Sequence, residues 1–174
     1  MRLFHILGFT SLKYLHPVLV EGKVPKTYLD LGYRSPAHTG PFVHAQDFLI
    51  PNPEEERLPI FAPASGTIIA LVQNNVRWGT AEEHKSFLNY LTVQVTGNPN
   101  QIGGEFYEIA HIDANSCPCK IGQQIKRGEV IAKTGLNGWM TSTDGFVDAH
   151  VHFMVGIWTR NTAFKSLMIR YGDS

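Results

Sequence analysis

Residues 149–158 read Ala-His-Val-His-Phe-Met-Val-Gly-Ile-Trp, a stretch in which polar and apolar residues alternate before an apolar end. Residues two apart in a β-strand point to the same face, so His150 and His152 project together, opposite to Val151 and Phe153. The pattern predicts a strand with one face on a hydrophobic core. Two imidazoles side by side suit a metal site, or one ligand beside one base. A half-exposed strand with two surface histidines fits the same spacing.

The rest of the chain is typical of short strands separated by turns. Residues 89–97, Asn-Tyr-Leu-Thr-Val-Gln-Val-Thr-Gly, alternate apolar and polar side chains, and residues 105–113 predict another strand. Glycine and proline are scattered along the chain, and no segment shows a long 3.6-residue periodicity. We therefore expect an all-β fold, a β-sandwich or barrel-sandwich hybrid of short antiparallel strands with long loops and little helix.

Three further stretches carry more detailed expectations. Residues 41–50, Pro-Phe-Val-His-Ala-Gln-Asp-Phe-Leu-Ile, predict a strand with a polar interruption. Residues 60–72 predict a hairpin-like unit whose turn is Ala-Pro-Ala-Ser-Gly. Residues 120–135 predict two short strands paired through a tight glycine turn.

Length and charge limit the classes of function. The 174 residues suit a single domain, with a motif region at about 32–155, an N-terminal extension at 1–31 and a polar C-terminal tail at 156–174. Fifteen Lys and Arg balance fifteen Asp and Glu, which argues against broad binding to nucleic acid or anionic membranes. No apolar run approaches the roughly 20 residues needed to span a bilayer, and the N-terminus lacks a clean export signal.

The two cysteines, Cys117 and Cys119, are separated by one proline. Cysteines this close rarely form an unstrained disulfide, and a structural zinc site needs four ligands. We expect a turn with two free thiols, so the cysteines do not indicate the compartment.

Two more polar residues interrupt apolar strands. Asp47 lies between the apolar residues 42–43 and 48–50, where a carboxylate needs a cation, hydrogen-bond donors or a metal. His111 interrupts Glu-Ile-Ala-His-Ile in the same way. Each residue alone is better explained by a satisfied buried polar group or by an exposed strand position. Together with the histidines of 149–158, they predict a zinc site assembled from separate strands, with three protein ligands and an open position for water.

Four motifs in one order resemble those of the lysostaphin-type zinc endopeptidases, which cleave peptide cross-bridges of bacterial peptidoglycan. Ala-His-Val-His-Phe resembles the family's Gly-x-His-Leu-His-Phe-Glu, and Glu-Ile-Ala-His-Ile resembles its Tyr-Ala-His-Leu strand. The segments at 59–68, Pro-Ile-Phe-Ala-Pro-Ala-Ser-Gly-Thr-Ile, and at 121–138 resemble its two glycine-containing motifs. The resemblance extends from about Gly32 to Val155.

The resemblance implies a zinc hydrolase and a role for each residue. It implies that Asp47 and His152 bind zinc, that His150 is the general base, and that His111 orients water and stabilises the oxyanion. It also implies a substrate of peptidoglycan or short small-residue peptides, and a location outside the cytoplasm by secretion, periplasmic export or phage delivery. We expect no nucleic-acid partner and no membrane span.

The third zinc ligand is where the sequence departs from the family's usual His-x-x-x-Asp. Val43 occupies the usual position, and His44, three residues before Asp47, would lie on the opposite face of a regular strand. A variant of the family's motif, His-x-Gly followed by Ala-x-Asp-Phe, fits His38 as the ligand. The segment Gly-Tyr-Arg at 32–34 resembles the approach to the usual motif and favours His44, with a bulge, as the alternate.

Other departures from the family's motifs bear on the identity of the substrate more than on the metal site. A charged insertion at 51–59 replaces the family's Gly-Thr, and Met154 stands where the family has glutamate. Two other functions stay open. One is a relative that keeps zinc without catalysis. The other is a histidine phosphocarrier, to whose segments Phe-Ala-Pro-Ala-Ser-Gly-Thr-Ile and Ala-His-Ile-Asp are similar. A phosphocarrier needs neither Asp47 nor the pair His150 and His152, which favours the hydrolase.

Overall fold

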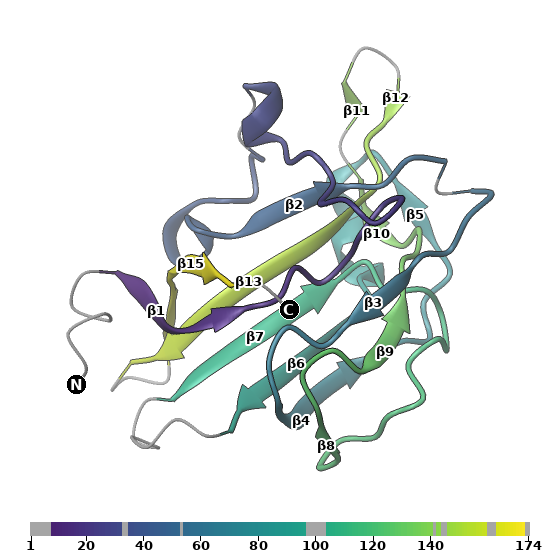
Figure 1. The fold of residues 1–174 in the computed structure, drawn as a ribbon. Coiled ribbons are helices and arrows are strands. Elements are labelled where there is room, and N and C mark those ends of the chain that lie inside the picture. Colours follow the sequence, from purple (N-terminus) through teal and green to yellow (C-terminus); the bar gives the residue numbers. More distant parts are fainter. Residues whose placement is uncertain are drawn as a thin grey trace.

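Short strands make up most of the molecule (Figure 1). The computed structural model describes residues 8–32, 35–52, 54–96, 104–140, 142–143, 146–159 and 163–172. The strands are β1 (Phe9–Tyr14), β2 (Gln46–Leu49), β3 (Pro59–Phe61), β4 (Gly66–Val72), β5 (Trp78–Gly79), β6 (Tyr90–Val95), β7 (Glu105–Ala110), β8 (Gln124–Ile125), β9 (Val130–Lys133), β10 (Gly138–Trp139), β11 (Ser142–Thr143), β12 (Phe146–Val147), β13 (His150–Trp158), β14 (Phe164–Ser166) and β15 (Met168–Tyr171). Helix in these ranges is limited to the 3₁₀ segments η1 (Leu29–Leu31), η2 (Gly40–Phe42) and η3 (Glu82–Phe87). The predicted all-β fold is confirmed.

A sheet of seven strands forms the centre of the described structure. Its order is β14-β13-β7-β6-β4-β8, and β2 also pairs with β13. All of these pairs are antiparallel. β13 pairs with β2 over 150–153, with β7 over 152–157 and with β14 over 156–158. Three neighbours therefore fix the register of β13, the strand that carries the two histidines.

One face of this sheet packs into the hydrophobic core. Val151, Phe153 and Val155 of β13 are fully buried there. The neighbouring strands add alternate residues to the same core: Leu91, Val93, Tyr107 and Ile109. Burial of each such side chain contributes roughly 1.5–3 kcal/mol. Because side chains alternate along a strand, His150 and His152 are turned to the opposite face.

A second layer closes the core. It consists of the antiparallel pair β3 and β9, whose Ile60 and Ile131 are fully buried in the same cluster. β4 pairs instead with β6 and β8. The predicted hairpins at 60–72 and 120–135 are therefore wrong, because β3 and β4 lie in different layers, as do β8 and β9 (Figure 1). Crossing between the layers lets each short apolar strand bury its face against the other layer.

Strands also lie near both ends of the described chain. β1 runs parallel to β15, so the predicted polar tail adds strands to the fold. The Tyr14 hydroxyl donates a hydrogen bond to Glu105 Oε2 at 2.6 Å, and both residues are fully buried. This contact ties the N-terminal strand to the start of β7.

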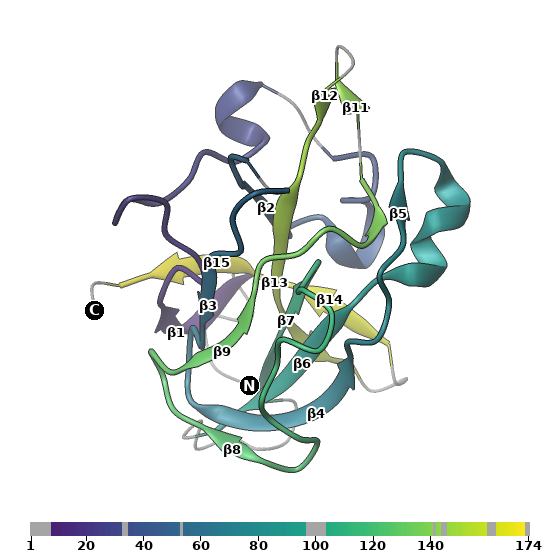
Figure 2. The ribbon, with the colours of Figure 1, turned by 90° about the vertical axis from the view of Figure 1, so that its right-hand side faces the viewer.

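Loops rise from the face of the sheet that is turned away from the core. Figure 2 shows η3 and β5 on one side of β13 and the segment that contains η1 on the other. β5 and β10 form a small parallel pair that supports the η3 side. Among the helices of the described ranges, none has the length and apolar character needed to cross a bilayer.

Tyr14→Phe removes the hydroxyl and leaves the buried Glu105 carboxyl without this donor. We expect the free energy of unfolding to fall by about 1–3 kcal/mol, measured by urea denaturation. The matched control is Tyr90→Phe, whose hydroxyl makes no hydrogen bond with any residue that the structure describes. It should change stability by less than about 0.5 kcal/mol. Equal losses in the two variants would show that the Tyr14 contact does not stabilise the fold.

Candidate metal site

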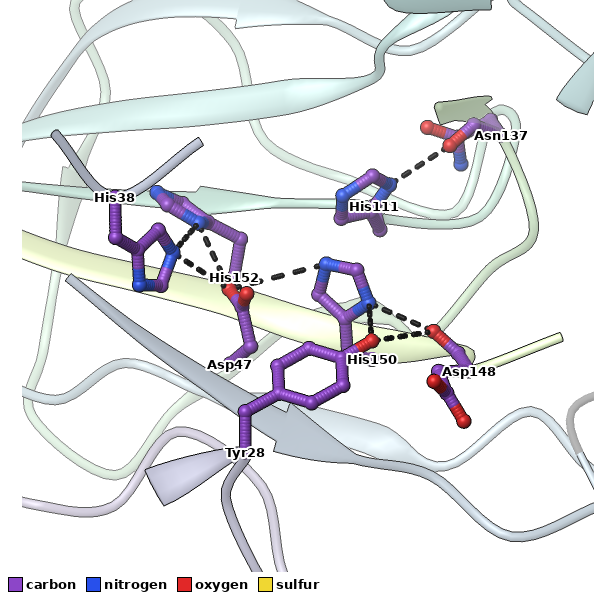
Figure 3. A network of polar contacts seen from close by, with 8 residues as sticks. All are labelled: Tyr28, His38, Asp47, His111, Asn137, Asp148, His150 and His152. Carbon is purple, nitrogen blue, oxygen red and sulfur yellow. Dashed lines mark hydrogen bonds and ion pairs between the residues drawn. The ribbon is translucent and has the colours of Figure 1, made fainter. Parts of the chain in front are cut away.

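Asp47 and His152 face each other across two neighbouring strands. They are direct register partners on β2 and β13, so their side chains share one face of the sheet. Asp47 Oδ1 lies 2.9 Å from His152 Nδ1 and 3.8 Å from His150 Nε2. Asp47 is only 2% exposed. Strand register thus brings a buried acid against two imidazoles (Figure 3).

His38 reaches the same carboxylate from the loop between η1 and η2. Its Nε2 lies 3.1 Å from Asp47 Oδ1 and 3.2 Å from His152 Nδ1. The loop turns here, and the His38 N–H donates to the Ser35 carbonyl at 3.0 Å. A loop and two strands therefore supply three candidate metal ligands, which Figure 3 shows converging on one point.

The alternate candidate, His44, lies apart from this group. The strand predicted over 41–50 begins only at Gln46, because η2 turns the chain before it, and that prediction is wrong in its first half. The His44 N–H donates to Ser166 Oγ at 3.0 Å. Among the described residues, the converging ligand atoms belong to His38, Asp47 and His152, without His44.

The geometry of the cluster fits a divalent cation. The three ligand atoms lie within 4.8 Å of one another. Tetrahedral ligands about 2.0 Å from zinc lie about 3.3 Å apart, close to the 2.9–3.2 Å found between these atoms. Asp47 Oδ2 is buried and makes no hydrogen bond within the described part of the chain. A cation coordinated by both oxygens of this carboxylate would satisfy that orphaned acceptor.

The charges around Asp47 favour the same conclusion for its carboxylate, whereas His152 must give up its proton to bind a metal. Burial alone would raise the pKa of Asp47, but the nearby imidazoles of His150, His152 and His38 hold it well below its usual value. Burial lowers the pKa of His152, and its hydrogen bond to Asp47 more than offsets this, so that the pKa rises. The carboxylate is therefore kept ionised, as a metal ligand must be.

His150 is oriented by groups behind it. Its Nδ1–H donates to the Asp148 carbonyl at 2.8 Å, which leaves Nε2 as an acceptor facing Asp47. The Tyr28 hydroxyl donates to the same carbonyl at 3.2 Å and lies 3.4 Å from Nδ1. The Tyr28 ring packs edge-on against the imidazole. These contacts hold the ring with Nε2 toward the cluster (Figure 3).

His111 follows the end of β7, and its ring centre lies 4.5 Å from that of His150. Its Nδ1–H donates to the Asn137 carbonyl at 2.7 Å, so its Nε2 is also an acceptor. Burial, and then the charge of His150, lowers the pKa of His111 to about 3. His111 is therefore neutral near pH 7 and accepts hydrogen bonds at its open nitrogen.

The backbone at His111 is left-handed, with φ of 62°, a conformation that costs a non-glycine residue about 1–3 kcal/mol. Two buried asparagines hold it in place. The Asn89 carbonyl accepts the His111 N–H at 2.9 Å, and Asn137 Oδ1 accepts the Asn89 N–H at 2.7 Å. Neither asparagine was predicted from the sequence, nor was Tyr28. Only Asn137 had a signal, its place in a glycine-containing motif.

The cluster opens on a cleft of about 600 Å³. Its lining includes Asp47, the two histidines of β13 and His111, which follows β7, and Glu108 and Ala110 of β7 form its floor. Residues 35–37 and 39–42 contribute one wall, and Lys85 of η3 with Trp139 contributes the other. The predicted catalytic residues and two of the candidate ligands, Asp47 and His152, thus line one cavity, large enough for part of a peptide.

No protein-family model matches the chain, and no curated protein matches its sequence. Solved structures match its fold. A zinc-containing peptidase from Vibrio cholerae aligns over 93% of this chain and 40% of its own, with 18% identity and a TM-score of 0.53. A Ruminococcus gnavus protein assigned as the glycyl-glycine endopeptidase LytM aligns over 88% of this chain and 56% of its own, with 16% identity and a TM-score of 0.51. The chain spans about half the length of these two proteins.

A third match comes from the SpoIIQ–SpoIIIAH pore-forming complex. It covers 90% of this chain and 89% of that chain, with 14% identity and a TM-score of 0.51. At 14–18% identity these likenesses establish the fold alone. The chain has the fold of the peptidases that its motifs resemble, which confirms the resemblance predicted from the sequence. Because the same fold occurs in a pore-forming complex, the chemistry must be argued from the site.

His38→Ala should weaken zinc binding by at least about 100-fold, because it removes one of three ligand atoms. His44→Ala is the matched control and should keep the parental affinity, since its imidazole lies outside the cluster. Competition with a chromophoric chelator measures both constants, and elemental analysis should give one zinc ion per parental chain. The reverse order of affinities would make His44 the ligand instead.

Proposed function

We propose that the chain is a zinc-dependent endopeptidase that hydrolyses peptide bonds in the stem peptides or cross-bridges of bacterial peptidoglycan. The observation that carries the proposal is the convergence of three ligand atoms beside a cleft that is lined by two imidazole acceptors. The proposed ligands are His38, Asp47 and His152, and the proposed catalytic residues are His111 and His150. The ordered sequence motifs and the fold shared with a zinc-containing peptidase support it.

His150 is the proposed general base. Zinc held by the cluster would polarise the scissile carbonyl and lower the pKa of the attacking water. His150 Nε2, 3.8 Å from Asp47 Oδ1, is placed to accept the proton of that water. The same nitrogen then passes the proton to the departing amine. The Asp148 carbonyl and Tyr28 keep the ring in one orientation through both transfers.

His111 has a role that differs from the one implied by the family resemblance. Its Nδ1–H is already used by the Asn137 carbonyl, so a neutral His111 has no proton left to donate to an oxyanion. With a pKa lowered to about 3, it stays neutral near pH 7 and keeps Nε2 as a hydrogen-bond acceptor. The His150 ring lies 4.5 Å away, so both acceptors face the same part of the cleft. We assign His111 as a hydrogen-bond acceptor that orients the attacking water.

The proposed substrate rests on the resemblance and on the cleft. One protein of the same fold is assigned as a glycyl-glycine endopeptidase. The cleft of about 600 Å³ accepts an extended peptide beside the cluster. Peptidoglycan lies outside the cytoplasm, so we propose an extracytoplasmic site of action, reached by secretion, periplasmic export or phage delivery.

A second candidate is a zinc-binding module without catalysis. The match to a chain of the SpoIIQ–SpoIIIAH complex over nearly its full length favours this candidate. Against it, a module that only binds has no use for two imidazoles oriented with open acceptors over the same cleft. The support for a histidine phosphocarrier is weaker still. Such a carrier works with two histidines and has no need of Asp47 or of the contact that His38 makes with it.

His150→Ala and His111→Ala are each expected to lower kcat/KM by about 10²–10⁴-fold, because the first removes the general base and the second removes the acceptor that orients the attacking water. The substrates are purified peptidoglycan and pentaglycine, and new amino termini are counted with an amine-reactive dye. Zinc content should stay at one ion per chain in both variants. His44→Ala should hydrolyse at the parental rate. Unchanged hydrolysis in both test variants would falsify the catalytic proposal, and zinc binding without hydrolysis by the parental chain would favour the binding module.

Tyr28→Phe is expected to lower kcat by about tenfold, because His150 loses the hydroxyl that restrains its ring. KM and zinc affinity should stay at parental values, since Tyr28 belongs to neither the cluster nor the lining of the cleft. A change in stability, followed by urea denaturation, separates a folding defect from a positioning defect. Parental kcat in this variant would remove Tyr28 from the mechanism.

A further inference from the structure

The floor of the cleft carries a carboxylate that the proposed mechanism does not use. The register of β13 and β7 places the residues of this floor. His152 lies opposite Ala110, and Met154 lies opposite Glu108. Glu108 in turn lies opposite Thr92 of β6. The Glu108 side chain therefore shares a face with His152, one row further along β13, and it lines the cleft.

No lysine or arginine pairs with Glu108 among the residues that the structure describes. The hydrogen bond that it accepts within this part of the chain comes from the Thr92 hydroxyl, at a long 3.4 Å. Burial raises the pKa of Glu108, and the attraction of His152 and the Thr92 contact offset this only in part. A half-buried carboxylate in this state gains stability from a cation that enters the cleft.

The lysine of the cleft wall is already engaged. Lys85 Nζ lies 2.7 Å from Glu82 Oε1, and it sits over the Trp139 ring, 4.5 Å from the ring centre. Both contacts hold the ammonium against η3 and β10. Lys85 therefore does not neutralise Glu108, which is left as the charged group of the floor.

The surroundings of Glu108 are largely apolar. Phe42 lines one wall of the cleft, Leu88 and Trp139 line the other, and the small Ala110 lies between Glu108 and the cluster. Such walls accept a chain of methylene groups. The carboxylate at the floor accepts charge-assisted hydrogen bonds from a group at the end of that chain.

We propose that Glu108 is a specificity-determining residue that binds the terminal ammonium of a substrate side chain with an aliphatic stem, as in lysine and related diamino acids. The inference rests on the proposed function, because it places that side chain next to the bond held at the metal cluster. The ammonium N–H groups donate to the Glu108 carboxylate while the stem lies against Phe42 and Leu88. The subsite selects the residue beside the scissile bond rather than the bond itself.

Matched peptides test this subsite. Starting from a peptide that the zinc-loaded chain hydrolyses, lysine or norleucine is placed at each position flanking the cleaved bond. At one of these positions, kcat/KM should be about 10- to 100-fold higher for the lysine peptide than for the norleucine peptide. Glu108→Gln keeps the shape, removes the charge and should bring this ratio close to unity. Glu83→Gln, on the exposed surface of η3, is the matched control and should keep the parental ratio.

The outcomes separate this inference from the proposed function. Equal hydrolysis of the lysine and norleucine peptides by the parental chain overturns the inference and leaves the peptidase standing. Equal losses for both peptides in Glu108→Gln, with weaker zinc binding, also overturn it, because Glu108 then supports His152 instead of the substrate. If the parental chain hydrolyses nothing, the proposed function fails and calorimetry decides the subsite. Tighter binding of the lysine peptide that Glu108→Gln abolishes supports it, and equal binding overturns it.

Discussion

The pairing of β2 with β13 is the constraint on which the site depends. It sets Asp47 opposite His152 and buries the carboxylate away from water. A buried carboxylate costs several kcal/mol unless cations or donors surround it. The approach of His38, His150 and His152 to one oxygen, within 3.8 Å, offsets this cost. A slip of one residue in β2 would turn Asp47 into the apolar core and disperse the cluster.

Backbone carbonyls, rather than charged side chains, orient the two imidazoles that are the proposed acceptors. Those of Asp148 and Asn137 accept the Nδ1–H groups of His150 and His111, so both rings keep Nε2 as an acceptor. The left-handed backbone at His111 lets its ring meet that of His150 beyond the end of β7. Acceptors that are oriented before substrate arrives need no reorganisation during the reaction. The strain at this turn is therefore placed where it serves the proposed chemistry.

Local alternation allowed the sequence to determine the main strands and one face of the site. The strands predicted within 149–158 and 89–97 are present as β13 and β6. Alternation of apolar and polar residues shows which side chains of a strand are buried, and it does so without knowledge of the neighbouring strands. The same alternation places His150 and His152 on a common face. Asp47 was indicated by its apolar neighbours and by the family resemblance, since a carboxylate within an apolar run requires a partner.

Only the tertiary structure decided which strands pair and which loop reaches the carboxylate. The predicted hairpins are crossovers between layers, because burial against a distant strand outweighs pairing with the adjacent one. His38 rather than His44 reaches Asp47, because the 3₁₀ turn of η2 redirects the chain between them. The contact of Tyr28 with His150 joins residues 122 positions apart. No local pattern specifies such a contact, since it exists only after the sheet has formed and the N-terminal segment has packed beside it.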